Sequence, residues 1–251
     1  MNQKERKKLR DLVVTYGRDE RGNPLPASWN DATLFAQCRS LVCNHAPEYE
    51  ATGEFWHVEM PLSLEPLERL VCVELVSTDI QVLPRMPKSL ERLICRHNLL
   101  NDLGSILPEA LKEIYCMGNR IVQWPKMPES LECLTLFNTL KLFRKTSNID
   151  LNELDPLPPS LKVLILGNVP LTNIPELPTN LQKLQLFHCG ITHLPKLPGA
   201  LIDIDVYEKD LTSVSNEREY FEAPGRHLTS PSIRKILIKK IERKKGGRKS
   251  A

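Results

Sequence analysis

Leucines recur at a fixed spacing through the middle of the chain. From Leu70 onward, segments of 20 or 21 residues begin with L-x-x-L-x-L and end with a variant of L-P-x-L-P, as in LKEIYCMGNRIVQWPKMPES (111–130) and LQKLQLFHCGITHLPKLPGA (181–200). One segment, 131–160, is longer, at 30 residues. Self-similarity at such a period predicts a repeat array in which no unit buries its apolar face alone and each unit stacks on its neighbours.

The repeat predicts a strand followed by an extended return. Alternation in L-x-x-L-x-L predicts a short strand whose leucines point inward. Asn98 and Asn119 follow their strands where a side-chain amide can satisfy backbone groups of the turn, and Thr78 and Cys189 are weaker substitutes. Proline lacks an N–H and fixes φ, so the L-P-x-L-P stretch predicts a polyproline-like return rather than a helix.

These features predict an α/β solenoid. We expect a curved leucine-rich-repeat horseshoe over residues 61–214, with a parallel sheet on the concave side and a polyproline-like convex side. Residues 1–60 would form a helical N-terminal cap, and residues 215–251 a connector with a basic C-terminal extension. In the cap, apolar spacing predicts a helix over 2–16 and a second from Asn30 to about Val42. The stretch FWHVEM (55–60) is interpreted as an irregular first strand.

The pattern LPxLPxxLxxLxLxxNxLxx, present here as IPELPTNLQKLQLFHCGITHLPKLPGALIDIDV, resembles the bacterial effector class of leucine-rich repeats. That class includes the YopM-like and IpaH-like arrays, and similar short repeats occur in giant-virus proteins. The resemblance covers about residues 61–214. It implies a horseshoe with a helical cap and a protein-binding role in a host cytosol. The ubiquitin-ligase branch of the class uses a Cys-x-Asp nucleophile motif, and none of the seven cysteines here is followed two places later by Asp.

Outward positions of the predicted strands suggest a binding surface. Because side chains alternate, the third, fifth and seventh residues of L-x-x-L-x-L-x face the concave side. Apolar residues gather at these positions in the middle of the array, which is typical of an interaction surface. We therefore predict a protein-binding site formed by Ile94, Arg96, Tyr115, Met117, Phe137, Val163, Ile165 and Phe187. Cover of this patch by the C-terminal helix, or a different strand register, are the alternatives. The insertion 139–148 predicts a rim loop that either supplies specificity or is a neutral insertion.

Charge is distributed unevenly along the 251 residues. The chain has a net charge of +3, yet residues 231–251 carry nine Lys or Arg against one acid, Glu242. Ile233, Ile236, Leu237 and Ile241 fall on one face of a predicted helix there. Such a segment can bind phosphate backbones or anionic lipids, act as a nuclear-import signal, or be a solvated terminus. The candidate anion- or nucleic-acid-binding residues are Arg234, Lys235, Lys239, Lys240, Arg243, Lys244 and Lys245.

Other chemistry finds little support in the sequence. The spacing of Cys38, Cys43, His45 and His57 matches no closed zinc pattern, and neither a phosphate-binding loop nor a G-x-S-x-G motif is present. Seven dispersed cysteines favour free thiols in a reducing compartment, with Cys95 and Cys116 standing in for core leucines. No apolar run reaches the roughly 18–20 residues that cross a bilayer. We expect no enzymatic activity, cofactor, metal or small-molecule substrate, and a cytoplasmic location, either host cytosol or nucleus.

The sequence therefore predicts a non-catalytic adaptor or scaffold that binds a partner protein, such as a host protein, through the concave face. The alternative is a nucleic-acid- or anionic-membrane-associated protein that uses its basic tail, with the solenoid as scaffold. A substrate receptor for a ligase acting in trans is a third hypothesis.

Overall fold

The computed structural model describes residues 1–46, 52, 54, 56–104, 107–121, 126–138, 156–169, 171, 174–207 and 211–215. Contacts within the chain divide it into two units, Met1–Leu131 and Glu132–Ala251. Each unit is described by itself. Within the described parts, no helix is long and apolar enough to cross a membrane.

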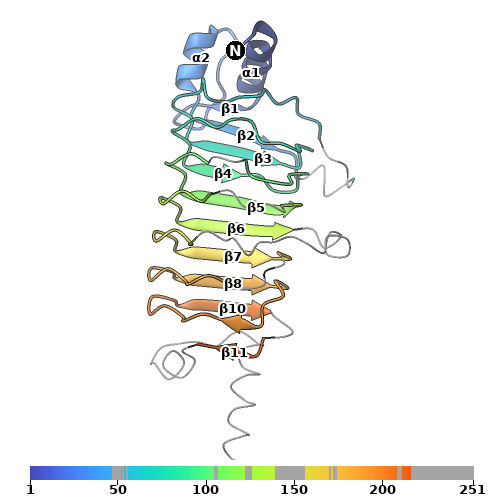
Figure 1. Ribbon diagram of the computed structural model, residues 1–251. Helices are drawn as coiled ribbons and strands as arrows, with labels where there is room; N and C mark the ends of the chain where they lie inside the picture. Colours follow the sequence, from blue (N-terminus) through green and yellow to red (C-terminus); the bar gives the residue numbers. More distant parts are fainter. Residues whose placement is uncertain are drawn as a thin grey trace, which may run out of the picture. The chain divides into compact units, whose positions relative to one another are not determined.

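The first unit begins with two helices and continues as a parallel sheet (Figure 1). Its elements are α1 (Gln3–Tyr16), β1 (Gly17–Arg18), α2 (Asp31–Gln37), β2 (Ser40–Asn44), β3 (Cys72–Val76), β4 (Arg92–Ile94) and β5 (Glu113–Asn119). Strand β1 pairs antiparallel with β2, and β2 to β5 pair in parallel in chain order. Cys72 lies opposite Arg92, and Arg92 opposite Glu113, so the pairing advances by one sequence repeat per strand.

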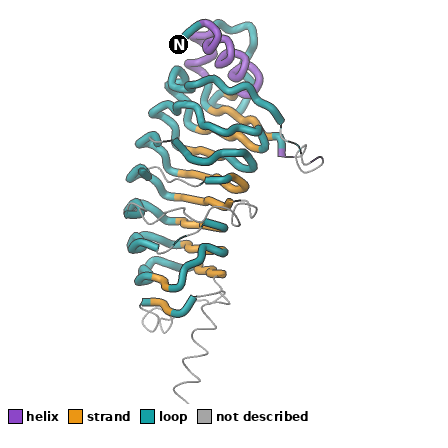
Figure 2. The backbone as a smooth tube through the Cα atoms, turned by 45° about the vertical axis from the view of Figure 1, so that its right-hand side comes forward, coloured by secondary structure: helices purple, strands orange, loops and turns teal. Residues whose placement is uncertain are grey.

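The second unit is a parallel sheet of the same kind. Its elements are β6 (Cys133–Asn138), β7 (Val163–Gly167), β8 (Lys183–Phe187), β9 (His193–Leu194), β10 (Asp203–Tyr207) and β11 (Ser213–Val214). Strands β6, β7, β8 and β10 pair in parallel, while β9 and β11 form a separate short ladder. In Figure 2 each coil carries its strand on one side and returns through a loop on the other. Both units are therefore solenoids of the leucine-rich-repeat type.

The core of each unit consists of the inward repeat positions, as predicted. Leu93, Leu184 and Leu186 have no exposed surface. The described parts of the L-P-x-L-P returns contain no helix. Each return instead ends in a Pro-x-x-Leu turn that leads into the next strand: the N–H of Leu90 donates to the Pro87 carbonyl at 3.2 Å, and that of Leu181 to Pro178 at 3.0 Å.

At the N-terminal end the structure confirms one predicted helix and corrects two other predictions. Helix α1 covers the expected residues, with Asn2 as its N-cap. The second helix begins at Asp31 as expected but ends at Gln37, and Leu41 lies in β2 rather than on a helix. Residues 56–60 form no strand, so the predicted first strand at 55–60 is wrong. In so short a segment, the spacing of apolar residues does not distinguish a helix from a strand. Leu41 and Cys43, which alternate along β2, are both buried.

A buried asparagine links neighbouring coils of the first unit. The Asn98 amide nitrogen donates to the carbonyls of Leu75 at 2.7 Å and Arg96 at 3.1 Å. Its oxygen accepts the backbone N–H of Thr78 at 2.9 Å and the Thr78 hydroxyl at 3.0 Å. The side chain therefore satisfies backbone groups of two coils that would otherwise be buried without partners, which confirms the role expected from the sequence.

The same position is used in later coils. Asn119 donates to the Cys95 carbonyl at 2.6 Å and accepts the N–H of Leu100 at 3.2 Å. In the second unit, the Cys189 thiol takes this place and lies 3.5 Å from the Leu166 carbonyl. Cys189 is the weaker substitute that the repeat predicts, because a thiol is a poor donor.

The first unit contains a disulfide that the sequence did not predict. Cys95 and Cys116 occupy inward positions of adjacent coils, with Cα atoms 5.0 Å apart and no exposed surface. Their sulfur atoms are bonded, so the expectation of free thiols is wrong for this pair. Sequence spacing alone does not show that two inward residues of neighbouring repeats lie side by side at bonding distance.

We predict that Asn98→Ala lowers the free energy of unfolding by about 2–4 kcal/mol, because it leaves several buried backbone groups without partners. Asn180→Ala is the control. Asn180 is exposed and makes one 3.3 Å hydrogen bond to Pro159, so its loss should cost less than about 0.5 kcal/mol. Urea denaturation of both variants measures the difference, and equal losses would contradict the structural role of Asn98.

Candidate protein-binding surface

Alternate residues of each parallel strand leave one side of the sheet accessible. The burial pattern of β8, half-buried at Lys183, Gln185 and Phe187 and buried between them, is typical of these strands. We call this side the strand face of each unit, formed by the third, fifth and seventh repeat positions. All eight residues of the predicted protein-binding site lie on it.

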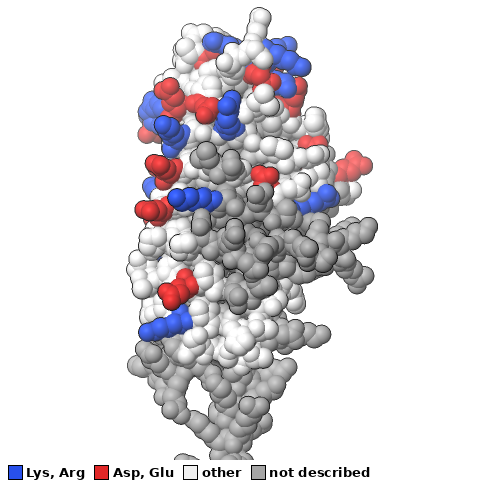
Figure 3. Space-filling view, viewed as in Figure 1, with Lys and Arg blue, Asp and Glu red and all other residues white. Residues whose placement is uncertain are grey.

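The strand face of the first unit combines apolar and charged residues. Ile94, Tyr115 and Met117 are half-buried there and Arg96 is exposed. The Tyr115 hydroxyl donates to Glu113 at 3.2 Å. Basic and acidic side chains are also interspersed over the part of this unit's surface that Figure 3 draws, so charge is not confined to the strand face.

Several polar groups of this strand face are paired within it. The Arg92 guanidinium contacts Glu113 at 2.8 Å through Nε and at 3.0 Å through Nη2. This contact holds the pKa of Glu113 below its ordinary value. One strand earlier, Asn44 donates to Glu74 at 2.7 Å. A surface whose polar groups already have partners offers fewer unsatisfied groups to a ligand.

The strand face of the second unit is more apolar. Phe137, Val163, Ile165 and Phe187 are all half-buried on β6, β7 and β8. Strand register places Ile165 between Thr135 and Gln185. The structure therefore brings the four predicted residues of this unit onto three consecutive strands.

Three aromatic rings form a continuous row along the seventh positions of the second unit. Ring centroids lie 5.7 Å apart for Phe137 and Phe187, and 5.9 Å apart for Phe187 and Tyr207, whose planes differ by 22°. We call Phe137, Phe187 and Tyr207 the aromatic row. Tyr207 is 46% exposed, and sequence analysis placed it at a seventh position without including it in the site.

Gly167 makes the aromatic row possible. Strand register puts Gly167 between Phe137 and Phe187, on the intervening strand. A Cβ at this position would collide with the Phe137 ring. Glycine therefore leaves the space through which two aromatic residues, two strands apart, come into contact.

Strand β10, at the end of this parallel sheet, adds two carboxylates beside the aromatic row. Asp203 pairs with Lys183 at 2.8 Å. Asp205, two residues further along β10, has a buried oxygen, Oδ1, with no hydrogen-bond partner. Burial, and then the nearby Asp203 carboxylate, raise the pKa of Asp205. The Asp205 carboxylate is thus partly dehydrated, one of its oxygens has no donor, and Lys183 offsets only part of the rise in its pKa.

The described residues offer little to a metal ion. No group of three or more His, Cys, Asp or Glu side chains is arranged to hold one among them. Burial raises the pKa of both Cys38 and Cys43 to about 12, which disfavours the thiolate that binds zinc.

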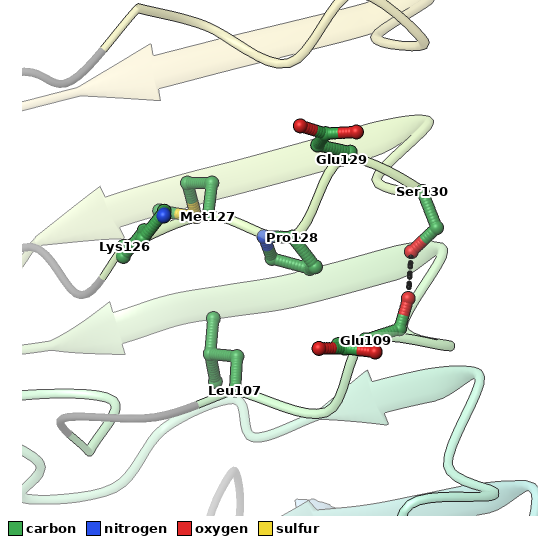
Figure 4. A pocket seen from close by; sticks show the side chains of 7 residues that line it. All are labelled: Leu107, Glu109, Lys126, Met127, Pro128, Glu129 and Ser130. Carbon is green, nitrogen blue, oxygen red and sulfur yellow. Dashed lines mark hydrogen bonds between the residues drawn. The ribbon is translucent and has the colours of Figure 1, made fainter.

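A pocket of about 590 Å³ lies on the return side of the first unit (Figure 4). Its lining combines Leu107 and Met127 with the charged side chains of Glu109, Lys126 and Glu129. The Ser130 hydroxyl, which also lines it, donates to the Glu109 carbonyl at 2.6 Å. Because the Ser130 hydroxyl is bonded to backbone carbonyls, the described lining residues contain no nucleophile–base arrangement.

Two predicted features lie outside the described residues. These are the insertion 139–148 and the basic tail with the candidate anion-binding residues Arg234, Lys235, Lys239, Lys240, Arg243, Lys244 and Lys245. Their binding roles stay predictions.

Comparison with known proteins gives a distant structural likeness. No protein-family model matches the chain, and no curated protein matches it. Among solved structures, the chain is similar to YopM from Yersinia enterocolitica WA-314, at 20% sequence identity and a TM-score of 0.36. The match covers 62% of this chain and 42% of the YopM chain. A likeness at this level carries no functional argument, so the function is argued from the strand faces.

We predict that Gly167→Ala disrupts the aromatic row without unfolding the second unit, because the added methyl group displaces the Phe137 ring from Phe187. Gly199→Ala is the matched control, since a Cβ at Gly199 meets no atom within 4 Å. The near-UV circular dichroism of the aromatic residues should change in the first variant and not in the second. An unchanged spectrum for Gly167→Ala would show that the row does not depend on this glycine.

Proposed function

We propose that this protein is a non-catalytic recognition module that binds a partner protein through the strand face of its second unit. The observation that carries the proposal is the accessible apolar group on β6 to β8, in which Phe137, Ile165 and Phe187 lie on consecutive strands. Apolar and aromatic residues that remain accessible on a folded surface are typical of protein-binding sites.

The arrangement of polar groups supports the choice of the second unit. Its apolar group is bordered by the Lys183–Asp203 ion pair and by the half-buried Asp205. An apolar centre with a polar border is the usual anatomy of a protein interface. The first unit contributes Ile94, Arg96, Tyr115 and Met117 as a second candidate surface, where Glu113 and Arg92 already satisfy each other.

Binding rather than catalysis is the activity that this surface supports. A row of aromatic rings beside aliphatic side chains supplies contact area and no activated nucleophile. The predicted adaptor role, the host partner and the cytoplasmic location are part of the same proposal and depend on identifying the partner.

We predict that Ile165→Asp abolishes partner capture, because it places a charge at the centre of the proposed interface. Wild-type and variant proteins are immobilised, exposed to cytosolic extract, and the captured proteins are quantified by mass spectrometry. The captured amount of each protein that the wild type enriches should be about tenfold lower, or lower still, with the variant.

Val82→Asp serves as the control, since Val82 is 73% exposed and lies outside the strand face. It should capture the same partners as the wild type. Thermal denaturation checks that each variant is folded. Equal capture by wild type and Ile165→Asp, or unfolding of Ile165→Asp, would contradict the assignment of this face as a binding surface.

A further inference from the structure

The end of the second unit's strand face combines stacked rings with a carboxylate that is only partly compensated. Tyr207 and Asp205 lie two residues apart on β10, and side chains alternate along a strand, so both belong to the same face. Their Cα atoms are separated by about 7 Å along the strand. Phe187, on the neighbouring strand, stacks against Tyr207.

The carboxylate of Asp205 has a cation, Lys183, near enough to lower its pKa, but burial and Asp203 outweigh it and the pKa is raised overall. The nearest base, Lys183, is engaged with Asp203 at 2.8 Å. Asp205 Oδ1 is buried and has no hydrogen-bond donor. A buried polar atom without a partner costs free energy. Because Asp205 is only half-buried, its side chain can turn this oxygen toward a ligand's donor and recover that cost.

We infer that this end of the strand face binds an arginine side chain of the partner protein, with the guanidinium pairing to Asp205 and lying against Tyr207 and Phe187. Charge complementarity selects a cation. The aromatic rings then select arginine over lysine, because a planar guanidinium stacks on a ring and presents a fork of donors to a carboxylate. The inference rests on the proposed function and specifies the partner's anchoring residue.

The raised pKa of Asp205 agrees with this geometry. The shift arises first from burial and then from Asp203, both of which disfavour the charged carboxylate. An arginine bound at Asp205 opposes both effects. Asp205→Asn removes the charge while keeping the shape, so this variant should remain folded and lose only the ion pair.

A phage-displayed library of random short peptides, selected on the full chain, tests the inference. We expect the enriched peptides to share an arginine, and we expect Asp205→Asn to bind the synthesised peptides about tenfold more weakly. Replacing that arginine by lysine or citrulline should weaken binding to the wild type by a similar factor, but have little further effect on Asp205→Asn. Glu176→Gln, at an exposed acid outside the strand face, is the control and should bind like the wild type.

The outcomes separate this inference from the proposed function. Enriched peptides without a shared arginine, whose binding is lost in Ile165→Asp, would overturn the arginine site and leave the binding face intact. Peptides that bind wild type, Ile165→Asp and Asp205→Asn equally would overturn both. If peptides are enriched only after the basic residues of 231–251 are changed to Gln, the site is occupied by the chain's own tail. A dimer that dissociates on Asp205→Asn would assign it to a second copy, and either result overturns an external partner.

Discussion

Burial of inward side chains against the next coil is the interaction on which each unit depends. A single coil has too few residues to enclose its own leucines, so Leu93 or Leu184 is shielded only when coils lie above and below it. Asn98 and Asn119 strengthen the same contact, because each bonds backbone groups of two coils at once. Apolar burial and backbone hydrogen bonding therefore both favour continuation of the stack.

This constraint explains why the strand faces are available for function. Inward positions are committed to stacking, whereas the residues between them contact only neighbours on the same side of the sheet. In the first unit those neighbours pair with one another, as Arg92 does with Glu113. In the second unit, Phe137, Phe187 and Tyr207 form a row of rings, and one oxygen of Asp205, Oδ1, is left without a donor. The same scaffold thus presents one face with an internal ion pair and another with accessible apolar surface.

The sequence predicts those parts of the structure that follow from the repeat. Inward leucines, the asparagine positions and the extended returns all recur at one period, so each copy supports the others. Strand β2 is missed because its segment, with Leu41 and Val42, lies before the regular repeats and has apolar spacing that also fits a helix. Ladder β9–β11 is missed because it lies in the return, where prolines suggest no pairing.

In the candidate site too, some residues are predicted from the sequence and others are recognised only from the structure. Phe137, Val163, Ile165 and Phe187 were predicted from strand alternation and lie together on the strand face. The roles of Gly167 and Asp205 depend on which residues are neighbours across strands, and no single repeat contains that information. The disulfide between Cys95 and Cys116 could not be predicted for the same reason, since only the lateral register of the strands brings the two sulfur atoms together.

A comparison of two adjacent residues on β8 tests the central claim most directly, namely that inward residues hold the fold while outward residues bind. Chemical denaturation of Leu186→Ala and Phe187→Ala, with capture of the same partner measured for each, separates the two roles. Leu186→Ala should lower the free energy of unfolding by about 2–5 kcal/mol, because it leaves a cavity in the core. Phe187→Ala should cost less than about 1.5 kcal/mol and lose the partner. Equal destabilisation by the two substitutions, or partner binding unaffected by Phe187→Ala, would contradict this account.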